Sequence, residues 1–238
     1  VLSGFAGGAI IPVFGPQGSL VLMGCGYALG TLLLVFIRSG GSHRPRAVVA
    51  PPGFLQALRA GYGLARTNRR VLGLFLLTVC GEIFAFSHQT LVPVFARDVL
   101  DAGAAGLGAL TSARALGSVA SSLVLARFAY YHDRTRLLLW HYALYGACMV
   151  AFAVSTSLPL SVVLMAGVGL AASSLDILQQ TLMQLAVRDE DRGRAVGYWV
   201  AALGFGPVGH LEIGSLGALA GAPVAMAANG VAVCLVFV

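Results

Sequence analysis

The sequence predicts an all-α fold, a polytopic membrane helix bundle, on three observations. Hydrophobic residues make up 58% of the 238 residues, and charged residues only 10%. A soluble domain usually carries about 25% charged residues, so this chain has too few charged residues to cover a water-exposed surface. The apolar residues occur in runs long enough to cross a bilayer, which takes roughly 20 helical residues. Such runs form helices, because hydrocarbon requires local backbone hydrogen bonding and the strand-like alternation of a membrane barrel is absent from the sequence.

The apolar runs define the expected helices in chain order. Runs wide enough to span are 18–37, 71–96, 103–126, 137–155, 159–187, 195–219 and, marginally, 222–238. Residues 1–13 are too short to span, and they lack the basic start and cleavage site of a signal peptide. We therefore expect them to be the outer part of a truncated helix, and the chain to be a fragment.

The arginines orient these spans. The 15 basic residues are all arginines, and 13 of them fall in the segments 38–70, 127–136 and 188–194. The connections between these segments hold one arginine or none, so arginine-rich and arginine-poor loops alternate. The positive-inside rule then places the rich loops in the cytoplasm, which predicts a bacterial-type inner membrane protein. This pattern is typical of a membrane protein and argues against a nucleic-acid partner.

The long connection 38–70 contains a second periodic pattern. Apolar residues recur at helical spacing from Phe54 to Ala65. This spacing predicts an amphipathic helix on the membrane surface, and an ordinary linker is the alternative.

No pattern indicates a metal, a cofactor or an enzyme. The four cysteines lie in four different apolar runs without C-x-x-C spacing, as small packing residues do. The five histidines are scattered, and no H-E-x-x-H motif is present. Gly167 and Gly169 lie within an apolar run, where small residues let helices approach closely.

Four ionisable residues lie inside predicted spans, and each is a candidate functional residue because its insertion costs several kcal/mol. Arg114 lies at mid-membrane, and Glu82 and Asp176 lie well inside their spans. Glu212 lies in the outer half of its span, and His88 is expected to be a satisfied polar residue near the outer end.

Neighbouring polar residues at helical spacing extend three of these positions into stripes. The stripes are Thr78, Glu82 and Gln89; Thr111, Arg114, Ser118 and Ser121; and Ser173, Asp176, Gln180 and Gln184. We expect them to face a common cavity, where a carboxylate near Arg114 exchanges a proton for a substrate. A static ion pair between Arg114 and an acid is the alternative.

Several motifs carry a resemblance to a known family. Residues 3–8, SGFAGG, are similar to the end of the fifth-helix G-P-x-x-G-G motif, and Gly206-Pro207-Val208-Gly209 lies at the symmetry-related position. Asp133-Arg134-Thr135-Arg136 is similar to a degenerate D-R-x-G-R loop. Together with the loop pattern, these motifs resemble the major facilitator superfamily. The stretch 176–214, with its Arg192-Gly193-Arg194 turn, resembles the branch of enterobactin-type siderophore exporters and macrolide efflux proteins.

The resemblance implies an organisation. Residues 1–37 would be the last one and a half helices of an N-terminal half, 38–70 the central cytoplasmic loop, and 71–238 the six-helix C-terminal half. It also implies alternating access, with Gly206, Pro207 and Gly209 bending a helix. The loop residues Asp133, Arg134, Arg192 and Arg194 would latch one access state, and an ordinary charged loop is the alternative.

The expected function is proton-coupled efflux of an amphipathic small molecule, drug-like or siderophore-like. An importer or facilitator of a metabolite, a channel and a structural membrane subunit are the alternatives. The expected partners are the small-molecule substrate, the lipid bilayer, protons and the missing N-terminal half. Expressed alone, the fragment is expected to insert without transporting.

Overall fold

The computed structural model describes residues 18, 21, 24–33, 63, 66, 68–127 and 133–235. The chain divides into two compact units, residues 1–52 and 53–238. In the first unit, residues 24–33 form the apolar helix Gly24–Leu33. The motif at residues 3–8 and most of the predicted amphipathic helix lie outside the described residues.

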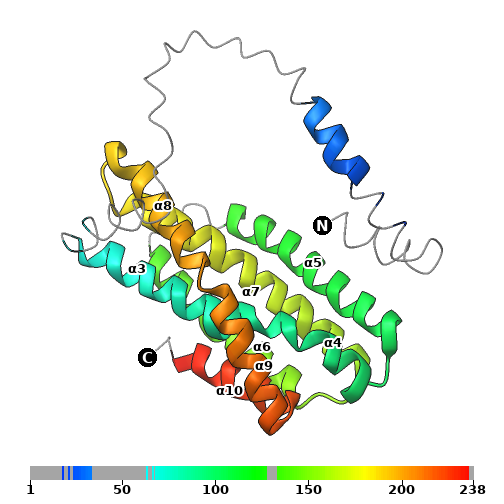
Figure 1. Ribbon diagram of the computed structural model, residues 1–238. Helices are drawn as coiled ribbons and strands as arrows, with labels where there is room; N and C mark the ends of the chain where they lie inside the picture. The colour runs from blue at the N-terminus through cyan, green and yellow to red at the C-terminus, as the bar shows by residue number, and fades with distance from the viewer. Residues whose placement is uncertain are drawn as a thin grey trace. The chain divides into compact units, whose positions relative to one another are not determined.

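The second unit is a bundle of helices (Figure 1). Its α-helices are α3 (Arg69–Cys80), α4 (Val92–Val94), α5 (Gly103–Arg127), α6 (Arg134–Ala153), α7 (Leu158–Leu185), α8 (Arg192–Leu203), α9 (Gly206–Ala220) and α10 (Ala222–Leu235). Four helical stretches are long and apolar enough to cross a membrane: Arg69–Val99, Gly103–Arg127, Arg134–Ala153 and Leu158–Leu185. The all-helical prediction is confirmed, and these four stretches match the predicted spans to within a few residues.

The first of these stretches is not a uniform helix. Two π-helical segments, Gly81–Ala85 and Phe95–Val99, flank a 3₁₀ segment, Phe86–Thr90, and the short α4. Pro93 in α4 has no N–H to donate, which weakens regular helical bonding there. Because π-helical turns are frequent at functional sites, this stretch, Arg69–Val99, is a candidate functional region.

The run 195–219 is not one uninterrupted helix. Gly204 and Phe205 separate α8, of 12 residues, from α9, of 15 residues. Pro207 lies in the first turn of α9, where its missing N–H costs nothing, so the sequence favours a new helix start at this point. The next helix, α10, has 14 described residues, Ala222–Leu235, and residues 236–238 of the predicted run 222–238 lie outside the described residues.

Glycines set the closest helix contact, between α5 and α7 (Figure 1). A Cβ added to Gly117 would overlap the backbone of Ala166, and a Cβ added to Gly169 would overlap the backbone of Arg114. The hydroxyls of Ser121 and Ser174 also lie 2.8 Å apart across this contact. The predicted packing role of Gly169 is confirmed.

The main core lies where α6 packs on α7 and α10. Large side chains of α6 fill it, among them Tyr142, Tyr145, Met149 and Phe152. A smaller core joins α3, α7 and α8, where the rings of Phe75 and Tyr198 stack at 4.0 Å. These two cores fix the stretch Arg69–Val99 against the rest of the bundle.

Candidate functional site

Glu82 lies in the first π-helical segment, directly against the start of α9. A Cβ added to Gly206 would lie 3.2 Å from the Glu82 carboxylate oxygen Oε2. A Cβ added to Gly209 would lie 2.7 Å from the Glu82 carbonyl oxygen. Two glycines next to the α8–α9 break therefore allow α9 to touch the backbone and carboxylate of Glu82.

Arg114 and Asp176 belong to α5 and α7, and both are partly buried. Asp176 interacts electrostatically with both Arg114 and Glu82. No ion pair within 4 Å joins Arg114 to either carboxylate in the described part of the chain. The three predicted charges thus share one region of the bundle.

Two tyrosines of α6 bind the backbone of the irregular stretch. Tyr142 Oη donates to the Leu77 carbonyl at 2.9 Å, and Tyr145 Oη donates to the Ala85 carbonyl at 2.9 Å. Gln179 Nε2 of α7 donates to Tyr142 Oη at 2.5 Å. The first π-helical segment, Gly81–Ala85, is therefore held from both ends by side chains of a neighbouring helix.

His88 extends this network. Its Nδ1 lies 2.8 Å from the Ala85 carbonyl and 2.9 Å from Tyr145 Oη. Within residues 68–127 and 133–235, its Nε2 is buried without a partner, as is the donor Nε of Arg114. Buried polar atoms without partners are costly, and each marks a position where a water or a ligand group can bind.

Glu212 joins a second polar cluster. Asn229 Nδ2 of α10 donates to Glu212 Oε2 at 3.0 Å and to Ser87 Oγ at 3.2 Å. Next to this cluster, the Thr90 hydroxyl and His210 Nδ1 lie 2.8 Å apart. Asn229 therefore links α10 to Glu212 of α9 and to the 3₁₀ segment Phe86–Thr90.

Only some residues of the predicted polar stripes are buried in the bundle. Thr78 and Ser121 are buried and Ser118 is half-buried, donating to the Gly169 carbonyl. Gln89 and Thr111 are exposed and donate to carbonyls of their own helices. The glutamine that enters the core is Gln179 rather than the predicted Gln180 or Gln184, which are half-buried.

Sequence reasoning missed five residues of these clusters. Gln179 and Asn229 were not predicted, Ser87 was not assigned a role, and Tyr142 and Tyr145 were considered only as aromatics that line a pocket or pack in the core. The signal in the sequence was a single amide or hydroxyl side chain within an apolar run, since such groups require a hydrogen-bond partner in hydrocarbon.

The charged loops form local contacts. Asp133 caps α6 by accepting from the Arg136 amide at 2.9 Å. Arg192 pairs with Asp189 at 2.9 Å, and Arg194 pairs with Asp191 at 3.0 Å, all near the start of α8. Each of these pairs lies within one loop, so they order the start of α8.

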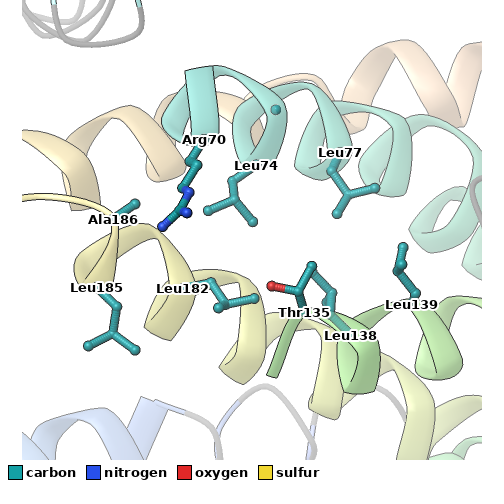
Figure 2. Close-up of a pocket in the computed structure, with 10 residues that line it drawn as sticks. Arg70, Leu74, Leu77, Thr135, Leu138, Leu139, Leu182, Leu185 and Ala186 are labelled. Carbon is teal, nitrogen blue, oxygen red and sulfur yellow. The ribbon is translucent and has the colours of Figure 1, made fainter. Parts of the chain in front are cut away.

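A cavity of about 500 Å³ lies between α3, α6 and α7 (Figure 2). Its lining is mostly leucine, and none of the predicted polar stripes contributes a residue. It is therefore distinct from the region of Glu82, Arg114 and Asp176.

Apolar helices of membrane-spanning length with charges inside them define a multi-pass α-helical membrane protein. Residues 90–238 match the family model described as Major Facilitator Superfamily. The chain therefore belongs to this family, whose members are membrane transporters and not enzymes. No curated protein and no solved structure matched the chain.

Proposed function

We propose that the chain is part of a proton-coupled exporter of an amphipathic, drug-like or siderophore-like molecule. The observation that carries this proposal is the arrangement of Glu82, Asp176 and Arg114 inside the spans without an ion pair between them. A carboxylate that is not locked in a salt bridge can take up and release a proton as its surroundings change. We assign the proton to Glu82 or Asp176, and part of the substrate contact to Arg114, Ser118 and Gln180.

The contact between Glu82 and α9 supports a link between protonation and movement. The Glu82 carboxylate lies against Gly206, beside the break between α8 and α9. A change of charge at this carboxylate alters its interaction with the N-terminal end of α9, where the helix dipole favours a negative charge. Gly206, Pro207 and Gly209 would then bend as the carboxylate gains or loses its proton. Gln89 and Glu212 would line the outer part of the same pathway.

The resemblance of residues 176–214 to siderophore and macrolide exporters supports export and an amphipathic substrate. We further propose that residues 71–238 form the C-terminal half of the transporter, with 1–37 and 38–70 as the end of the N-terminal half and the central loop. The arginine-rich loops would face the cytoplasm of an inner membrane. The loop residues Asp133, Arg134, Arg192 and Arg194 would hold one access state.

The test is transport in membrane vesicles by the whole transporter, with a panel of amphipathic compounds and with or without an uncoupler. Glu82→Gln and Asp176→Asn are expected to reduce uphill transport at least tenfold (about 1.4 kcal/mol), because neither amide can carry a proton. Glu190→Gln, which removes an acid from an exposed loop, is the matched control and should transport normally. Gradient-dependent transport that survives in both carboxylate variants would refute the proton role.

The same assay separates the alternatives. An importer would accumulate substrate in the opposite direction, and a facilitator would saturate without responding to the uncoupler. A channel would show neither saturation nor coupling. A structural subunit would show no flux.

A further inference from the structure

The cavity between α3, α6 and α7 lies at the arginine-rich end of the bundle (Figure 2). Its lining includes Arg70 near the start of α3, Thr135 near the start of α6, and Ala186 just after α7. Thr135 is flanked in the sequence by Arg134 and Arg136. In a membrane-spanning bundle, this end of the helices lies at the level of the lipid headgroups.

The wall of the cavity is apolar and begins beside this charged end. Two leucines from each of the three helices line it: Leu74, Leu77, Leu138, Leu139, Leu182 and Leu185. Gly73 adds space, because a Cβ placed on it would meet nothing within 4 Å. The interior thus suits a hydrocarbon chain.

The mouth is bordered by a fixed helix contact and carries a positive charge. Asn68 Nδ2 donates to the Ala186 carbonyl at 2.6 Å and fixes the start of α3 to the end of α7. Figure 2 shows the Arg70 side chain reaching from α3 toward Ala186. Within residues 68–127 and 133–235, no ion pair or side-chain hydrogen bond engages the Arg70 guanidinium.

The acids of the two charged loops have other partners. Asp133 accepts from the Arg136 amide, and Asp189 and Asp191 pair with Arg192 and Arg194. The cavity therefore combines an apolar interior with a cation at its mouth that pairs with no described acid.

We propose that this cavity binds an anionic phospholipid of the surrounding bilayer, with an acyl chain among the leucines and the phosphate at Arg70. Basic pockets between membrane helices bind anionic headgroups in this way, because charge and apolar surface recognise the two ends of one molecule. The Thr135 hydroxyl would donate a hydrogen bond to the headgroup. This lipid site is separate from the proposed proton and substrate site, and either proposal can fail without the other.

The test is native mass spectrometry of the purified chain titrated with phosphatidylglycerol or with phosphatidylcholine that carries the same acyl chains. The unmodified chain should bind phosphatidylglycerol about fivefold more tightly, since one arginine near an anionic headgroup contributes about 1 kcal/mol. Arg70→Gln should abolish this preference. Arg127→Gln, which removes an exposed arginine outside the cavity, should retain it.

A second variant tests the cavity rather than the charge. Gly73→Leu fills space inside the cavity and should lower the binding of both lipids. Gly214→Leu places the same side chain on α9, where an added Cβ also meets nothing within 4 Å, and should bind as the unmodified chain does. Equal retention of the two lipids, or a preference unchanged by Arg70→Gln and Gly73→Leu, would overturn the proposal. A lipid preference that neither variant changes is the result expected if another part of the chain fills the cavity.

Discussion

The hydroxyl of Tyr142 on α6 accepts a hydrogen bond from the Gln179 amide of α7 and donates one to the Leu77 carbonyl of α3. One phenol therefore joins three helices just before the first π-helical segment. Gly81 makes room for it, since a Cβ at that position would lie 2.8 Å from Tyr142 Oη. Position 81 consequently has to be a glycine for this junction to form.

We predict that Tyr142→Phe lowers the free energy of unfolding by about 1 kcal/mol, as hydrogen bonds between membrane helices usually contribute. Gln179→Leu should have a similar effect. The double variant should lose less than the sum of the two, because both changes remove the same bond. Unfolding of the purified chain in detergent measures this, and strictly additive losses would show that the two residues act independently.

The sequence predicts where the helices are but not how they are broken. Long apolar runs and arginine-rich loops define α5, α6 and α7, because spanning length and burial of hydrocarbon depend on composition alone. The π-helical and 3₁₀ turns between Gly81 and Val99 have no such signal. They depend on tertiary partners, such as the Tyr145 hydroxyl at the Ala85 carbonyl.

The polar faces were harder to predict than the spans. Successive helix positions are about 100° apart, so choosing Gln180 in place of Gln179 turns the predicted face away from the core. In α5 and α7 apolar residues surround the helix on all sides, and polarity alone does not show which side faces protein. The three charges Glu82, Arg114 and Asp176 are candidates on the sequence alone, because a charge in hydrocarbon is costly on any face.

The α5–α7 contact gives a second prediction. Gly117→Ala should destabilise the chain by about 1–3 kcal/mol, because the added methyl overlaps the Ala166 backbone, which cannot move without separating the helices. Gly108→Ala on the same helix is the matched control, since nothing lies within 4 Å of its Cβ position. It should be neutral or slightly stabilising, as alanine favours helix more than glycine does. Equal unfolding free energies for the two variants would contradict the close contact.

The Asn229–Glu212 bond gives a prediction about charge. Asn229→Asp replaces the donor 3.0 Å from Glu212 Oε2 with a second acidic group. The hydrogen bond is lost and two acidic side chains then face each other, so the expected loss of stability is about 3 kcal/mol.

The matched variant is Asn229→Leu, which removes the donor without adding an acidic group. It should lose less stability than Asn229→Asp. Thermal unfolding in detergent distinguishes them. Equal losses in the two variants would mean that Glu212 does not contact position 229.

The proposed orientation of the chain in the membrane can be tested with single cysteines. In a background from which the four native cysteines have been removed, Ser157→Cys places a thiol in the exposed, arginine-free turn before α7. Glu190→Cys places one in the exposed, arginine-rich turn before α8. These two turns lie at opposite ends of α7, so a membrane-impermeant maleimide added to intact cells should label only one of them. The positive-inside rule predicts labelling at position 157 and protection at position 190 until the cells are permeabilised. The reverse pattern would invert the orientation, and labelling at both positions would show that α7 does not cross the membrane.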